Sequence, residues 1–190
     1  MDLRSRNIAI ASGVAGLIAV FGIVGYRIGE RSIGSGAGIS AQGREVPQAS
    51  QANNSALIDE LKASLKERPG DPEILGRIGD AYFDLKQFNE AVIYYKMALA
   101  KKPNDAEIYN DIGLSVHYLG NSSEGLRYVE EGLKKNPYHQ RIWLTKGFIL
   151  AYGMGDLEGA RAAWEKARKL NPNSQVGKAA SDFLVQFNKK

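Results

Sequence analysis

Apolar residues follow two different patterns along the chain. Residues 8–26 form an apolar run without a charged residue, whereas from residue 55 onward apolar residues return every three or four positions among polar ones. The first pattern is typical of a helix inside a lipid bilayer, and the second is typical of amphipathic helices that pack on one another. The sequence therefore predicts an all-α protein, with roughly eight helices and no strands after residue 55.

The apolar run 8–26 has the length of one transmembrane helix. At about 1.5 Å per residue it reaches roughly 28 Å, close to the hydrocarbon thickness of a bilayer. The alternative is a cleaved signal peptide, with residues 1–7 as its basic region and a cut after Ala37 or Ala41. The run exceeds the usual ~7–15 apolar residues, and charged residues separate it from those cleavage sites. We expect a short tail over 1–7 and an uncleaved anchor over 8–26.

The charges that flank this run give a weak orientation signal. Arg4 and Arg6 precede it, while Arg27 and Arg31 follow it together with an acidic residue, Glu30. A short tail with two arginines tends to stay in the cytoplasm. We therefore expect a single-pass protein of the bacterial inner membrane, with the rest of the chain in the periplasm.

Residues 27–54 are predicted to be a flexible linker. Most of the segment consists of Gly, Ser, Ala, Gln and Asn, and it has too few large apolar residues to form a core. A random coil of this length spans on the order of 25–30 Å. The linker would let the folded part move near the membrane without lying on it.

From residue 55 onward the sequence repeats itself. Gly79, Gly113 and Gly147 are each 34 residues apart. The prolines that follow them are separated by 34, 34 and 35 residues, and they are Pro69, Pro103, Pro137 and Pro172. The extra residue of the last interval falls in 151–156, where we expect a turn between helices.

The side chains within each period resemble the tetratricopeptide repeat, a pair of helices of 34 residues. The first copy matches at Leu75, Ile78, Gly79, Tyr82, Ala91, Tyr95, Ala98 and Pro103. The second matches at Tyr109, Ile112, Gly113, Val116, Gly125, Val129, Gly132 and Pro137. The third matches at Trp143, Lys146, Gly147, Leu150, Ala160, Trp164, Ala167 and Pro172. The resemblance implies a right-handed solenoid of three repeats, at 71–104, 105–138 and 139–173.

Two further helices are predicted to cover the ends of this array, because solenoid units cannot bury their apolar faces alone. Residues 55–70 carry leucines every four residues and look like the second half of an earlier repeat. Residues 174–190 form a C-terminal capping helix with one apolar stripe, made of Val176, Ala180, Phe183, Leu184 and Phe187.

Some positions depart from the repeat pattern. Gly125 and Gly132 stand where alanine is usual, and each costs about 1 kcal/mol of helix stability relative to alanine. Lys146 stands where a leucine is typical, so it is expected either to extend to solvent or to face a carboxylate.

In the family that the chain resembles, the first helices line a concave groove that holds a peptide or a partner helix. On these helices the inward positions are apolar and aromatic in the centre and acidic toward the first repeat. This composition favours a polypeptide segment with apolar anchors and some basic residues. The candidate groove residues are Asp80, Phe83, Asn110, Leu114, His117, Tyr118, Leu144, Phe148 and Tyr152.

Composition argues against chemistry at this groove. The chain has no cysteine, and we find no phosphate-binding glycine motif and no pair of histidines at metal-ligand spacing, so we expect no cofactor, no metal and no enzyme activity. His139 is expected in an exposed turn.

Charge gives no sign of a nucleic-acid surface. Residues 1–50 hold five basic and three acidic residues, and residues 51–190 hold twenty basic and eighteen acidic residues. Each part is therefore close to balanced in charge. Lysines and arginines before each proline complement the C-terminal end of a helix.

The resemblance also suggests a partner. Residues 141–174 are similar to periplasmic repeat subunits of bacterial cytochrome c maturation systems, which present apocytochrome c to the haem-ligation machinery. One alternative is a chaperone at a translocon or secretion complex that binds other exported polypeptides. Another is a structural scaffold that self-associates, and small residues at Ala11, Ala15 and Ala19 would also permit homo-oligomers through the membrane helix.

Overall fold

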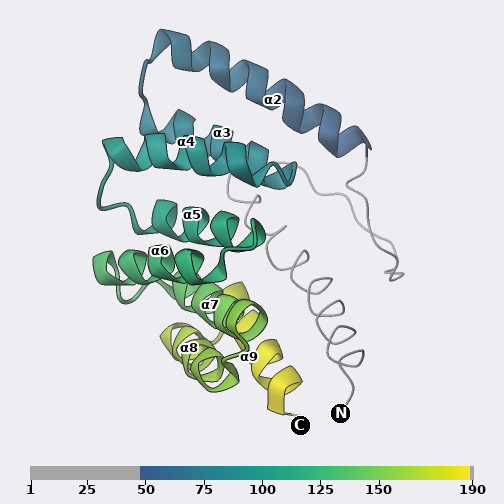
Figure 1. Cartoon of the computed structure of the whole chain (residues 1–190), viewed down its shortest axis with the longest axis vertical. Coiled ribbons are helices and arrows are strands. Elements are labelled where there is room, and N and C mark those ends of the chain that lie inside the picture. The colour runs from purple at the N-terminus through teal and green to yellow at the C-terminus, as the bar shows by residue number, and fades with distance from the viewer. Residues whose placement is uncertain (1–47, 189–190) are drawn as a thin grey trace. The chain divides into compact units, whose positions relative to one another are not determined.

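The computed structural model describes residues 48–188, and this part of the chain is entirely helical. From Asn54 onward the chain forms one compact unit, in which the helices stack in chain order (Figure 1). The elements are α2 (Gln48–Glu67), α3 (Pro72–Asp84), α4 (Phe88–Lys101), α5 (Ala106–Tyr118), α6 (Ser122–Lys135), α7 (Gln140–Phe148), the π-helix η2 (Ile149–Met154), α8 (Leu157–Leu170) and α9 (Gln175–Asn188). This is the all-helical solenoid, without strands in the described part, that the periodicity predicts.

Acidic and amide side chains mark where the helices begin. The Asp71 carboxylate accepts hydrogen bonds from the backbone N–H groups of Glu73 and Ile74, and Asp105 does the same for α5. Asn121 and Asp156 cap α6 and α8 in the same way. These caps satisfy N–H groups that have no partner inside the helix, and they recur with the period of the sequence.

The helix α2 begins earlier than the sequence analysis expects. It starts at Gln48, inside the range 27–54 that was predicted to be linker. Residues 48–54 contain neither glycine nor proline, so nothing in this stretch interrupts a helix, and Pro47 stands immediately before it. Composition alone did not distinguish this polar helical turn from a coil.

Within the first and third pairs, a glycine of the first helix receives an aromatic ring of the second. A Cβ atom on Gly79 would overlap the Tyr95 ring, and one on Gly147 would overlap the Trp164 indole. Trp164 is fully buried, and its Nε1 donates a hydrogen bond to the Leu144 carbonyl at 3.3 Å. The close approach of the two helices therefore requires glycine at these positions.

The middle pair uses glycine on both helices. A Cβ on Gly113 would meet the Gly125 carbonyl oxygen, and a Cβ on Gly125 would meet the Gly113 carbonyl oxygen. Gly132 faces the Ala106 carbonyl oxygen in a similar contact. The glycines that weaken α6 as an isolated helix thus allow the backbones of α5 and α6 to touch.

The extra residue of the third repeat lies in η2 and not in a loose turn. In the first two pairs the junction closes with hydrogen bonds from Gln87 N–H to Tyr82 O and from Asn121 N–H to Val116 O. In the third the corresponding bond runs from Asp156 N–H to Leu150 O, so the closed loop is one residue longer. A π-helical turn absorbs such an insertion while the chain stays helical.

Both ends of the stack are covered. On α2, Ile58 and Leu61 are buried, and Leu61 packs against Ile74 and Ile78 of α3. On α9, Phe183 stacks on Trp164 with ring centroids 4.8 Å apart. Among residues 48–188 no helix is both long and apolar enough to cross a bilayer, and the expected anchor over 8–26 lies outside the described residues.

Two glycine substitutions test this packing. Gly147→Ala is expected to lower the free energy of unfolding by ~1–3 kcal/mol, because the new methyl group overlaps Trp164. Gly76→Ala is the matched control: no atom lies within 4 Å of its added Cβ, so it should stabilise α3 by up to ~1 kcal/mol. Urea unfolding followed by circular dichroism measures both. Equal effects of the two substitutions would contradict the packing described here.

Candidate functional site

Aromatic rings from six elements, α3, α4, α5, α7, η2 and α9, touch one another in a continuous series. We call this series the aromatic row, and its members are Phe88, Phe83, Tyr118, His117, Phe148, Tyr152 and Phe187. Neighbouring ring centroids are 4.9–6.3 Å apart, within the range of favourable aromatic pairs. The row therefore runs along the stack from α3 and α4 to α9.

Five of the nine candidate groove residues belong to this row. Phe83, His117, Tyr118 and Tyr152 are half-buried, so each keeps part of its ring accessible, while Phe148 is buried. Burial lowers the pKa of His117 and raises the pKa of Tyr118 to about 12. Both shifts favour the neutral form, and the row is therefore uncharged at neutral pH.

The sequence analysis missed the two ends of the row. Phe88 is the first residue of α4 and stacks on Tyr118 at 4.9 Å, and Phe187 lies on α9 at 5.7 Å from Tyr152. Neither residue is on a first helix of a repeat, so the repeat pattern did not assign them to the groove. The signal that could have found Phe187 was the apolar stripe of the capping helix.

The acidic candidate, Asp80, belongs to a polar cluster that joins all three repeats. The Tyr95 hydroxyl donates to Asp80 Oδ1 at 2.8 Å. The neighbouring carboxylate, Asp111, accepts from Asn110 at 3.1 Å and from Arg141 at 2.9 Å. Asp111 and Arg141 are 30 residues apart in sequence, yet their side chains are only 18% and 13% exposed. The cluster links α3, α4, α5 and α7.

Burial controls the titration of this cluster. It raises the pKa of the Asp111 carboxyl to about 7, and the Arg141 guanidinium opposes that shift. Burial also raises the pKa of Asp80, although the hydrogen bond from Tyr95 opposes it. With Glu107 also near Arg141, one guanidinium faces three carboxyl groups. A cation placed beside these carboxyl groups would stabilise their ionised forms, whereas an anion would oppose their ionisation.

Two buried polar atoms of the cluster have no hydrogen-bond partner among residues 48–188. They are Asn110 Oδ1 and Arg141 Nε, one acceptor and one donor. Asn110 is fully buried, so an unsatisfied oxygen there costs free energy. Bound water or a ligand backbone could satisfy both atoms, which fits the role expected for Asn110 in contacting a bound chain.

The remaining candidates, Leu114 and Leu144, are buried apolar residues, at 3% and 1% exposure. They lie on α5 and α7, the first helices of the second and third repeats. Whether they touch a ligand stays a prediction.

A histidine and a serine lie close together beside the aromatic row. His117 Nδ1 is 2.9 Å from Ser122 Oγ, and a Cβ on Gly153 of η2 would overlap that serine. In the described part of the chain no carboxylate hydrogen-bonds to His117, so the pair lacks the acid that orients the base in a catalytic triad. The contact closes the junction between α5, α6 and η2.

The expectation that His139 is exposed is wrong. Its side chain is 18% exposed, and its Nε2 lies 3.2 Å from Glu107 Oε1 on the preceding repeat. The proline-containing turn places it at the N-terminal end of α7, where it faces α5. Within residues 48–188 no group of three or more His, Cys, Asp or Glu residues is placed to hold a metal ion.

Comparison with known proteins agrees with the repeat pattern of the sequence and with the fold. The sequence model of the TPR repeat matches residues 79–120, from the first repeat into the second. Residues 79–120 therefore carry a tetratricopeptide repeat, and the described part of the chain has the tetratricopeptide fold. No curated protein matches the sequence.

Solved structures of tetratricopeptide proteins share the fold. The crystal structure of MamA has a TM-score of 0.59 and 20% identity, over 75% of this chain and 88% of MamA. The first tetratricopeptide domain of Spaghetti (RPAP3), bound to the HSP90 peptide SRMEEVD, has a TM-score of 0.56 and 17% identity, over 62% of this chain and 90% of that one. The type III secretion translocator chaperone SycD of Yersinia enterocolitica has a TM-score of 0.58 and 16% identity. The match covers 62% of this chain and 91% of SycD.

The polar cluster predicts that the stability of the fold falls as the pH rises through about 7. Because the pKa of Asp111 is higher in the folded state than in the unfolded chain, the folded state binds more protons between pH ~4 and ~7. This contribution to stability is therefore fully present below pH ~4 and is lost as the pH rises through about 7. Carboxyl ¹³C NMR should give a titration midpoint near 7 for Asp111.

The matched control is Asp182→Asn, because the Asp182 side chain on α9 is exposed. This variant should change the free energy of unfolding by less than ~0.5 kcal/mol at any pH. Asp111→Asn should remove the loss of folding stability that is expected as the pH rises through about 7. A midpoint for Asp111 near 4 would show that the carboxylate is stably ionised and would contradict this account.

Proposed function

We propose that this chain is a non-enzymatic adaptor that holds a polypeptide segment along its aromatic row. The observation that carries the proposal is the continuity of the row, which crosses every repeat and reaches the capping helix. Half-buried rings offer large contact areas at low cost in side-chain entropy, which is why aromatic residues dominate binding sites for polypeptides. An extended segment or an amphipathic helix can place successive apolar side chains on such a row.

The polar cluster supports a basic segment as the occupant. Asp80, Asp111 and Glu107 lie around a single arginine beside the row, so a lysine or arginine of the ligand would meet an excess of carboxylate. The structurally similar RPAP3 domain is bound to the acidic peptide SRMEEVD. The present chain shares that fold but presents acidic groups, so its ligand should carry the opposite charge.

The more specific form of the proposal places this adaptor at a bacterial membrane. The apolar run 8–26 would anchor the chain in the inner membrane, and the repeats would face the periplasm. There the chain would hold apocytochrome c for haem ligation, as the likeness of residues 141–174 to cytochrome c maturation subunits suggests. One alternative is a chaperone for other exported polypeptides, a role that the similar fold of the secretion chaperone SycD favours. The other is a self-associating scaffold.

Capture by the purified full-length chain, kept in mild detergent, separates these versions. The probes are unfolded apocytochrome c, an unrelated unfolded exported protein and a second copy of the chain. Strong binding of apocytochrome c alone supports the maturation role, and equal binding of both unfolded probes supports the chaperone. Binding of the second copy alone supports the scaffold and contradicts the adaptor.

Variants of the row test whether capture uses the proposed face. The double variant Phe83→Ala, Tyr118→Ala should weaken binding of the captured polypeptide by about 30-fold or more, because two anchoring rings are lost. The control is Ile93→Ala on α4, which is 57% exposed and outside the row, and it should leave binding unchanged. Circular dichroism checks that both variants remain helical. Unchanged binding by the folded double variant would overturn the proposed face.

Membrane fractionation tests the anchor. The full-length chain should stay in the membrane pellet after extraction at alkaline pH, and deletion of 8–26 should release it. Protease added to spheroplasts should digest the repeats. Release of the intact chain, or a mature N-terminus after Ala37 or Ala41, would instead indicate a cleaved signal peptide.

A further inference from the structure

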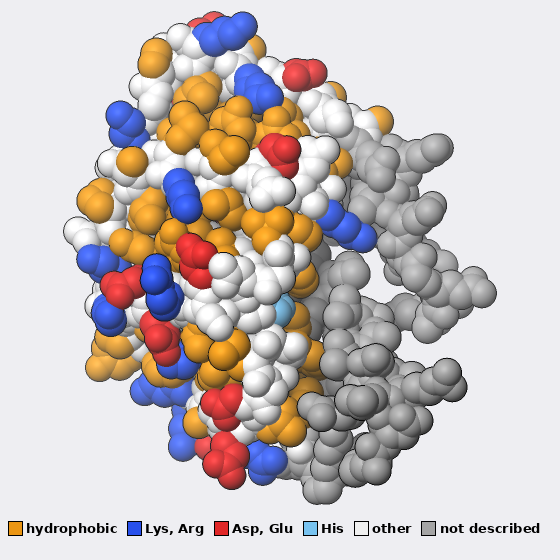
Figure 2. Space-filling model, in the orientation of Figure 1, with side chains coloured by type: hydrophobic (Ala, Val, Ile, Leu, Met, Phe, Trp, Pro, Cys, Tyr) orange, Lys and Arg blue, Asp and Glu red, His pale blue; other side chains and the backbone are white. Residues whose placement is uncertain are grey.

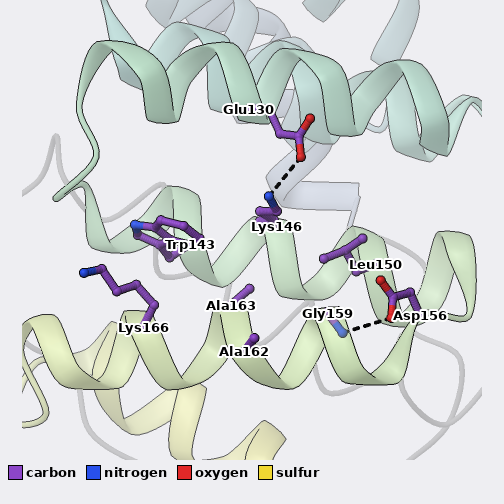
Figure 3. A pocket seen from close by; sticks show the side chains of 9 residues that line it. All are labelled: Glu130, Trp143, Lys146, Leu150, Asp156, Gly159, Ala162, Ala163 and Lys166. Carbon is purple, nitrogen blue, oxygen red and sulfur yellow. Dashed lines mark hydrogen bonds and ion pairs between the residues drawn. The ribbon is translucent and has the colours of Figure 1, made fainter.

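A hollow lies between α6, α7, η2 and α8. Its volume is about 490 Å³, and Figure 3 shows its walls. None of its lining residues belongs to the aromatic row or to the polar cluster. The lining consists of Glu130, Trp143, Lys146, Leu150, Asp156, Gly159, Ala162, Ala163 and Lys166.

The hollow combines an apolar wall with an aromatic edge. Leu150 and Ala163 are buried, while the half-buried Trp143 stands beside the Lys166 side chain at one end (Figure 3). The Trp143 Nε1 donates to the Pro137 carbonyl at 2.8 Å, which holds the indole in place. A single apolar side chain of a partner fits such a surface, because it would exchange water for contact with the indole and the alanines.

Most charges that line the hollow already have partners. Lys146 Nζ is 2.9 Å from Glu130 Oε1, as expected for a lysine that faces a carboxylate. The Asp156 carboxylate accepts from the Gly159 N–H at 2.9 Å and caps α8. Within the described residues Lys166 has no ion pair, and its ammonium lies 5.9 Å from the Tyr138 ring. Lys166 is therefore the charged lining residue that could still pair with a group of opposite charge.

The surroundings support a local site and not a general basic surface. On the face shown in Figure 2, Lys and Arg side chains are interspersed with Asp and Glu along the stack, so neither sign dominates. Lys101, Lys134 and Lys169 lie in the last turns of α4, α6 and α8, where cations complement the helix dipole. Lys166 lies before the last turn of α8 and lines the hollow.

We propose that this hollow binds an acidic polypeptide segment, with an apolar side chain against Trp143 and Ala163 and a carboxylate on Lys166. The two faces of the solenoid then bind segments of opposite charge. The second site is independent of the proposed function of the aromatic row, because it shares no residue with that face.

Tryptophan fluorescence gives a direct readout. The chain has two tryptophans, and Trp164 is fully buried, so a change at the protein surface reports on Trp143. The probe is the peptide acetyl-Asp-Leu-Glu-Leu-Asp-amide, titrated into the full-length chain. We expect a saturable change with a dissociation constant below ~1 mM, and no change with the lysine counterpart acetyl-Lys-Leu-Lys-Leu-Lys-amide. The variant Trp143→Phe should lose the signal.

Charge variants locate the binding. Lys166→Glu should weaken the acidic peptide at least tenfold, whereas Lys178→Glu on α9 makes the same change in net charge outside the hollow and should change the affinity less than twofold. Equal affinity of the Lys166→Glu variant and the unmodified chain would overturn the proposal. So would the absence of a saturable change, or a fluorescence change with phosphatidylglycerol vesicles alone, which would indicate a lipid surface.

Discussion

The close approach of two helices within each repeat is the constraint on which the rest of the structure depends. Glycine in the first helix lets an aromatic ring or a second glycine of the other helix reach its backbone, as Gly147 does for Trp164 and Gly113 for Gly125. The stacking of these pairs in chain order (Figure 1) also brings together the rings of the aromatic row, from Phe83 on α3 to Phe187 on α9.

The polar cluster is the second consequence of this stacking. Arg141 reaches Asp111 because the stacking of successive repeats brings α7 into contact with α5. A half-buried ion pair between repeats adds little net stability compared with apolar packing, because desolvation offsets the attraction. The pair fixes α5 and α7 relative to each other beside the aromatic row.

The periodicity of the sequence was sufficient to predict the all-helical solenoid. It left two positions open for Lys146, solvent or a carboxylate, and the structure shows the pair with Glu130. It could not predict the pairing of Asp111 with Arg141 or the place of Phe187, because these depend on distances between elements and not on spacing within one. A one-residue insertion likewise fits a loop or a π-helical turn equally well in sequence, and only the hydrogen bond from Asp156 distinguishes them.

The central claim is that a polypeptide lies along the aromatic row. Its most direct test is an NMR experiment on the full-length chain with ¹³C-labelled aromatic rings, to which unfolded apocytochrome c is added. The account predicts that the rings of Phe83, Tyr118 and Tyr152 change chemical shift together with increasing ligand, while the exposed ring of Tyr138 does not. Saturable binding with shifts confined to rings outside the row would contradict it.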